Sequence, residues 1–254
     1  NSRFYSSKLI CFEIIGRWQN KSRNVRTKYN LIGKCKTNQI FFIMELTEEK
    51  KNLNFVLWTK KLKDYNCYSE SLINELGDKL TNGTFNTNEI NGGCYDGSLI
   101  EVILNNLCTL GYHVNDLAFG LNQKNKLKHP FLSVNMDMLM RVLLLQHISK
   151  AELYIPQTEN WKKNKGFLYD FNGEIESQLK LGERSAFLCM KHGIKLSELE
   201  FEAMTIIDKD EKSFNSHQTP LAILVKMINQ LVAIELQRKY DYYNTEKKIE
   251  KGTI

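Results

Sequence analysis

Helix start and stop signals recur from residue 44 onward, and they constrain the fold of this chain more than any other feature. Ser197 followed by Glu200 is a capping box, in which the serine oxygen accepts a backbone N–H and the glutamate bonds back to the cap. Thr219 precedes Pro220, and proline is favoured at the first position of a helix. Thr47 and Ser69 are further caps, and Gly193 suits the left-handed end of a helix over 182–192. Most of the chain is therefore predicted to be helical.

The spacing of the apolar residues predicts which face of each helix is apolar. The helix after Thr47 carries Leu53, Val56, Leu57 and Lys60, and the helix after Ser69 carries Leu72, Ile73, Leu76 and Leu80 on one face. A helix starting at Ser133 has Leu139, Val142, Leu143 and Gln146 on one stripe, which predicts that Gln146 points inward.

Two further helix boundaries follow from local signals. Ser98 and Glu101 have the spacing of a second capping box, and Gly111 suits the end of the helix that follows. The last helix is predicted to run from Thr219 to Tyr240, followed by a polar tail over 241–254.

One segment breaks the helical pattern. Between 152 and 171, two runs rich in β-formers, 153–155 and 167–169, flank a polar stretch, which predicts a β-hairpin. With 254 residues and 42% hydrophobic side chains, the chain can bury one substantial core. The predicted fold class is mainly all-α with one β-hairpin insertion.

The positive charge lies in the first part of the chain. Residues 1–43 hold nine basic side chains and one acidic side chain, whereas the other 211 residues hold 26 basic and 28 acidic ones. The first Met is Met44. Residues 1–43 are therefore an irregular arm or an extraneous upstream stretch, a targeting segment, or a cationic arm that binds nucleic acid or an assembly partner. The spacing does not choose among these three.

Other features limit the class of protein. No uninterrupted apolar run approaches the roughly 18–20 residues of a membrane helix, so a soluble protein without membrane association is expected. The six cysteines form no CxxC pair and suggest no disulfide framework, which favours a reducing, cytoplasmic compartment.

Four blocks, in order, resemble the compact HD-domain metal-dependent phosphohydrolases of bacteria and their phages. Residues 95–102, YDGSLIEV, resemble Y-E-G-G-L-x-E-H, whose closing His is a metal ligand in that family. Residues 142–150, VLLLQHISK, resemble the helix with the HD pair, A-L-L-H-D-x-x-K, which a similar hairpin follows. Residues 181–185, LGERS, are similar to H-G-E-K-S, and residues 221–233 to the last helix, L-A-x-L-L-H-x-A-D. The resemblance implies an HD-domain-like helical bundle over 44–240.

The family uses its His and Asp cluster to hold a divalent cation, which activates water for attack on phosphorus. At the ligand positions implied by the resemblance this chain has other residues: Val102, Gln146, His147, Leu181, Ile207, Lys226 and Asn229. Aliphatic side chains offer no lone pair to Mg²⁺ or Mn²⁺. We therefore expect no catalytic residues, no metal and no cofactor, and a catalytically inactive domain that serves as a binding or structural subunit.

The polar residues that remain suggest a weaker alternative for the same region. The resemblance puts Lys150 close to the phosphate-binding region, and with Lys226 it could hold an anion without a metal. Arg184 and Ser185, at a predicted helix start, could receive a phosphate, so that a nucleotide-like ligand can be accommodated. For each of these residues a structural role is the simpler interpretation, as is a hydrogen-bonded structural role for His147.

Two rival functions stay open. The first is a working metal-dependent phosphohydrolase, with Mn or Mg held by relocated ligands: His147, Glu183, Asp208 and Asp210. The second is nucleic-acid association through residues 1–43 only. A protein partner or assembly is the partner favoured by the main interpretation.

Overall fold

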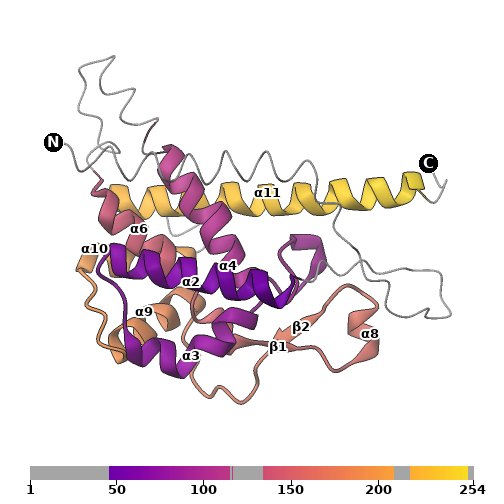
Figure 1. The fold of residues 1–254 in the computed structure, drawn as a ribbon, viewed down its shortest axis with the longest axis horizontal. Helices are drawn as coiled ribbons and strands as arrows, with labels where there is room; N and C mark the ends of the chain where they lie inside the picture. Colours follow the sequence, from indigo (N-terminus) through magenta and orange to yellow (C-terminus); the bar gives the residue numbers. More distant parts are fainter. Residues whose placement is uncertain (1–45, 115, 117–133, 209–217, 251–254) are drawn as a thin grey trace. The chain divides into compact units, whose positions relative to one another are not determined.

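The computed structural model describes residues 46–114, 116, 134–208 and 218–250, and it is mainly helical with one two-stranded antiparallel hairpin. Figure 1 shows the elements, whose bounds are α2 (Glu48–Asp64), α3 (Glu70–Asn82), η1 (Glu89–Asn91), α4 (Ser98–Val102), η2 (Ile103–Cys108), α6 (Met136–Leu145), α7 (Lys150–Leu153), β1 (Tyr154–Pro156), α8 (Asn160–Lys163), β2 (Tyr169–Phe171), α9 (Leu181–Lys191), α10 (Glu198–Thr205), η4 (Ile206–Asp208) and α11 (Pro220–Glu250). The predicted fold class is confirmed.

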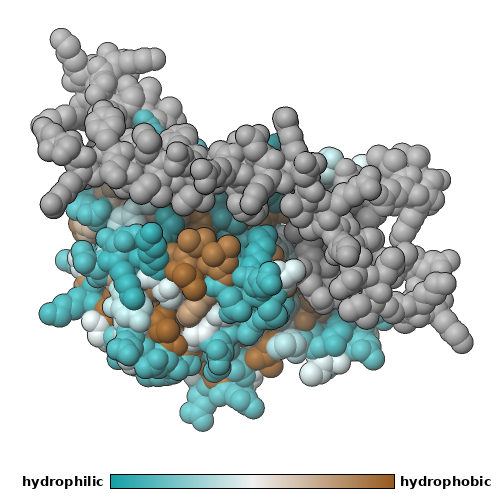
Figure 2. All heavy atoms as spheres, in the orientation of Figure 1, coloured by the Kyte–Doolittle hydropathy of each residue, from teal (hydrophilic) through white to brown (hydrophobic). Residues whose placement is uncertain are grey.

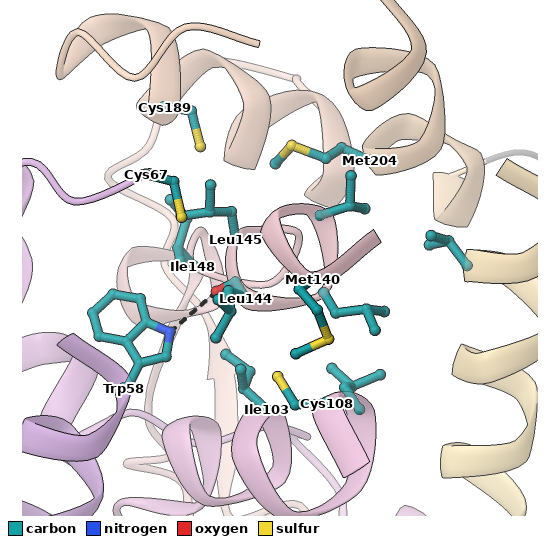
Figure 3. Packing of buried hydrophobic residues seen from close by; sticks show 14 of the residues in the cluster. Trp58, Cys67, Ile103, Cys108, Met140, Leu144, Leu145, Ile148, Cys189 and Met204 are labelled. Carbon is teal, nitrogen blue, oxygen red and sulfur yellow. Dashed lines mark hydrogen bonds between the residues drawn. The ribbon is translucent and has the colours of Figure 1, made fainter. Parts of the chain in front are cut away.

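The core is built around α6, which packs against η2, α10, α2, α9 and α11. Its residues from Leu139 to Leu145 are buried except for the half-buried Arg141. Trp58 of α2 is fully buried, and its indole N–H donates to the Leu144 carbonyl over 3.2 Å (Figure 3). The stripe predicted for this helix is therefore confirmed, including the inward position of Gln146.

Several predicted boundaries are confirmed by their caps. Thr47 and Ser69 accept backbone N–H groups at the starts of α2 and α3, and Ser197 with Glu200 forms the capping box of α10. Gly193, with φ +75°, follows α9. The hairpin pairs Tyr154 with Phe171, and a short helix, α8, occupies its connection.

The second predicted capping box is wrong. Gly97, with φ 80°, precedes α4, and no side chain caps this helix. The Ser98 hydroxyl instead donates to the Gly93 carbonyl and accepts from the Phe85 N–H. Glu101 accepts from Lys50 and from the Tyr95 hydroxyl. Both side chains therefore hold the preceding loop rather than the helix end.

Three other boundaries differ from the sequence prediction. Gly111 does not end its helix, because helical residues continue to Val114; a methyl group at Gly111 would lie 2.6 Å from a Leu143 methyl, so close packing accounts for this glycine. Ser133 lies outside the described residues, and Asn135 caps α6. Helix α11 continues beyond Tyr240 to Glu250.

The helix α2 does not bury the aliphatic residues that marked it in the sequence. Leu53, Val56 and Leu57 are 54%, 60% and 44% exposed, while the buried residues of α2 are Lys51, Asn54, Trp58 and Leu62. Burial of the large Trp58 determines which face of α2 turns toward the core.

One described segment, Pro220–Tyr242 of α11, is long and apolar enough to cross a membrane by length and composition alone. Polar residues interrupt this segment, so no uninterrupted apolar run marks it in the sequence. Core helices pass the same test, and Leu221, Val225 and Ile228 of this helix are buried in the core. The absence of membrane association stays a prediction, as does the cytoplasmic location.

The close approach of α9 to α10 gives a stability prediction. A methyl group at Gly182 would overlap the Met204 carbonyl oxygen and lie 2.8 Å from an Asp208 carboxylate oxygen. We expect Gly182→Ala to lower the free energy of unfolding by about 2–3 kcal/mol. The matched control is Gly173→Ala, at an exposed site with no atom within 4 Å, which should change it by less than about 0.5 kcal/mol. Urea unfolding followed by circular dichroism measures both, and equal stabilities would contradict the close packing.

Candidate functional site

A buried polar turn follows α6 at the place where the resemblance expects the HD pair. The helix ends at Leu145, and its cap, Gln146, still donates its backbone N–H to Val142 over 2.8 Å. Gln146, His147, Ser149 and Lys150 are each at most 5% exposed. Buried polar groups need hydrogen-bond partners, so other segments must supply them.

Asn229 of α11 joins the two residues at the start of this turn. Its Nδ2 group donates to the Gln146 Oε1 atom over 3.1 Å and to the Val225 carbonyl over 2.8 Å. Its Oδ1 atom lies 2.8 Å from the His147 Nε2 atom. Because an amide oxygen only accepts, Nε2 carries the proton and donates. Three of the residues at expected ligand positions therefore bond to one another.

The imidazole of His147 is held neutral. Burial lowers its pKa well below the usual value, and the nearby charge of Lys150 lowers this pKa further, while the Asn229 hydrogen bond opposes both effects. A neutral imidazole with its proton on Nε2 leaves Nδ1 as an acceptor. The Nδ1 atom of His147 and the Nε2 atom of Gln146 have no hydrogen-bond partner among the residues that the structure describes.

Lys150 is buried against the loop before α4. Its ammonium nitrogen donates to the Phe85 carbonyl over 2.7 Å and lies 3.5 Å from the centre of the Phe85 ring. The same ring meets the His147 ring edge-on at 4.9 Å between centroids. Burial lowers the pKa of Lys150 to about 7 from its ordinary value of 10.5. Lys150 thus fixes the Phe85 loop over the turn, in a setting that shifts its amine toward the neutral form.

The start of α9 contacts the same turn through hydroxyl groups. The Ser149 hydroxyl donates to the Leu181 carbonyl over 2.9 Å. The Ser185 hydroxyl donates to the Ser149 Oγ atom over 2.9 Å and accepts from the Ser149 backbone N–H over 3.2 Å. Arg184 pairs with Glu152 at 3.0 Å. Arg184 and Ser185 therefore make structural contacts here, and their role in anion binding stays a prediction.

Asp208 of η4 caps α9. Its two carboxylate oxygens accept the backbone N–H groups of Gly182 and Glu183 at 3.0 and 2.9 Å. Burial raises the pKa of Asp208, although these two hydrogen bonds act in the opposite direction. Its neighbour Ile207 is half-buried and packs against the core. Asp210, the other carboxylate of the rival hydrolase, lies outside the described residues.

The two other predicted ligand positions lie on α4 and α11. Val102 is buried. Gly93 packs between Val102 and Phe85, because a methyl group added at Gly93 would lie 3.5 Å from a side-chain carbon of each. Lys226 is half-buried on α11, one turn before Asn229. Within the described part of the chain, no group of three or more His, Cys, Asp or Glu side chains could hold a metal ion.

One member of the site, Phe85, is not predicted from the sequence. It contributes a carbonyl and a ring to Lys150 and a ring contact to His147. Phe85 lies in a loop, more than sixty residues before its partners, and no local pattern marks such a contact. The nearby pair Gly92 and Gly93, both with positive φ, is a signal of a special loop but does not indicate its partner.

Comparison with known proteins gives no match: no protein-family model, no curated protein and no solved structure is significantly similar to this chain.

The buried Lys150 gives a prediction about stability and pH. The unfolded chain keeps the lysine proton up to about pH 10.5, whereas the folded chain releases it near pH 7. Between these values the unfolded state binds more protons, so the contribution of Lys150 to stability rises with pH. Relative to Lys150→Met, the wild type should therefore gain on the order of 3 kcal/mol of unfolding free energy between pH 7 and pH 10.

Urea unfolding at four pH values measures this difference. The matched control is Lys163→Met, which removes the same kind of side chain from an exposed position. A difference for Lys150→Met that changes with pH no more than the difference for the control would show that the Lys150 amine is not buried in solution.

Proposed function

We propose that the protein is a catalytically inactive, HD-like helical domain that acts as a binding or structural subunit. The observation that carries this proposal is the hydrogen-bonded set Gln146, His147 and Asn229. These residues stand at three of the positions where the resemblance expects metal ligands, and they come from two segments more than eighty residues apart.

The contact between these segments supports the HD-like architecture. In an HD site, the helix with the HD pair and the last helix must lie close enough to share one ion. Here the turn after α6 and the middle of α11 are joined through Asn229. The mainly helical fold, with a hairpin that follows this turn after the short helix α7, agrees with the same block order.

The hydrogen bonds also support the loss of catalysis. The Asn229 oxygen accepts from His147 and the Gln146 oxygen accepts from Asn229, so both oxygens are already engaged. Val102, Leu181 and Ile207 offer no side-chain lone pair. Metal-assisted hydrolysis needs a cation that keeps an open position for water. A neutral amide and imidazole network performs a structural task instead, by joining α11 to the turn.

Exposed apolar residues support a role in binding a protein partner. Large apolar side chains at least 44% exposed are grouped on α2 and on α11: Leu53, Val56 and Leu57, and Met227, Leu231 and Ile234. Apolar residues grouped at helical spacing on a surface are typical of interaction sites. A nucleotide-like ligand at Lys150 or Lys226 stays a prediction, and so does nucleic-acid binding by residues 1–43, which lie outside the described part.

Metal titration tests the proposal directly. We expect the purified chain to show no stoichiometric uptake of Mn²⁺ by calorimetry and no Mn²⁺-dependent hydrolysis of nucleotides or of p-nitrophenyl phosphate. One Mn²⁺ per chain together with turnover would refute the proposal in favour of the relocated-ligand hydrolase.

Introducing metal-ligand residues at the expected positions tests whether these positions correspond to an HD metal site. The combined variant Val102→His, Gln146→His, His147→Asp and Asn229→Asp places imidazole and carboxylate groups at four of the expected positions. We expect it to bind Mn²⁺ with a dissociation constant in the micromolar range, about −8 kcal/mol, while the wild type does not. A variant that keeps its helical circular dichroism spectrum but fails to bind would show that these positions do not converge on one point.

A further inference from the structure

The exposed face of α2 has an apolar centre and charged ends. Glu49, Leu53, Val56, Lys60 and Lys63 are all exposed, and their alternating spacing of four and three residues puts them on one face of the helix. Figure 2 shows apolar side chains gathered on the surface over the middle of α2 as it is drawn in Figure 1. The face opposite, with Trp58 and Leu62, is buried in the core.

The charges on this face are ordered along the helix axis. On this face the first turn of α2 carries the acidic Glu49 and the last turn carries the basic Lys63. Val56 is the middle residue of the helix, and Glu49 and Lys63 stand at equal distances before and after it. The face is therefore complementary to itself when a second α2 runs in the opposite direction.

From this symmetry we infer that α2 packs antiparallel against α2 of a second copy of this chain, around a two-fold axis at Val56. Val56 then meets its own counterpart, and each Leu53 lies against the aliphatic stem of the opposite Lys60. Each Glu49 lies opposite a Lys63. A parallel arrangement would bring Glu49 to Glu49 and Lys63 to Lys63, which like-charge repulsion disfavours.

A two-fold contact of this kind is closed, because each copy uses the same patch and no surface is left to add a third chain. A 17-residue helix is about 25 Å long, so the interface is small and the dimer should exchange with monomer at micromolar concentrations. The dimer does not depend on the state of the buried turn, so metal binding there would leave this proposal standing.

Sedimentation velocity on the full chain, from about 1 to 100 μM, tests the dimer. We expect a concentration-dependent equilibrium between monomer and dimer for the wild type. Val56→Glu should weaken the dimer at least about tenfold. The matched control is Leu199→Glu, at an exposed apolar residue of α10 that belongs to neither apolar group, which should leave the equilibrium unchanged.

Charge exchange tests the antiparallel direction. Glu49→Lys and Lys63→Glu should each weaken self-association, because each creates two like-charged pairs across the axis. An equimolar mixture of the two variants should recover the dimer, since every Lys then faces a Glu of the other chain. Recovery in the mixture also shows that each variant still folds.

Three results would overturn the proposal. The first is a wild type that stays monomeric at 100 μM, whether or not it sediments with phosphatidylcholine vesicles. The second is a dimer that Leu199→Glu abolishes and Val56→Glu leaves intact. The third is a pair of folded charge variants whose mixture does not recover the dimer.

Discussion

The buried polar turn after α6 is the constraint on which the arrangement of the other segments depends. Four polar residues, Gln146, His147, Ser149 and Lys150, enter the core together, and leaving such groups unpaired would cost stability. Their partners come from three distant places: the Phe85 loop, the start of α9 and the middle of α11. Because each partner must arrive at a fixed point on the turn, the turn sets the positions of these elements around α6.

The same constraint explains why this cluster of buried polar residues resembles an active site and yet favours a structural role. A metal site needs several lone pairs directed at one point. Here the Asn229 amide instead donates to the Gln146 amide oxygen, so the two side chains bind each other. A neutral network avoids the cost of burying charge, and Lys150, the cationic residue among the four of this turn, is moved toward its neutral form by burial. Its contact with the Phe85 ring and carbonyl compensates for part of the lost hydration.

Local signals predicted the helices well and their long-range contacts poorly. The box at Ser197 and Glu200 was right because both side chains stay within their own turn, whereas Ser98 was wrong because its hydroxyl bonds to the loop at Gly93. Gln146 was correctly predicted to point inward, since its stripe is apolar. Neither its bond to Asn229 nor the contact of Lys150 with Phe85 could be read from spacing, because these pairs are separated by more than sixty residues.

The orientation of α2 shows how one large side chain can decide which others remain exposed. Rotating α2 by about half a turn would bury the 54% of Leu53 and the 60% of Val56 that are now exposed, contributing about 1 kcal/mol each. It would also expose Trp58 and break its bond to the Leu144 carbonyl, leaving that acceptor without this donor. Trp58 and Leu62 bury more apolar surface than the smaller pair, so the monomer keeps its observed orientation. Within one chain the exposed surface of Leu53 and Val56 therefore contributes no hydrophobic stabilisation. It contributes only when another surface covers these two side chains.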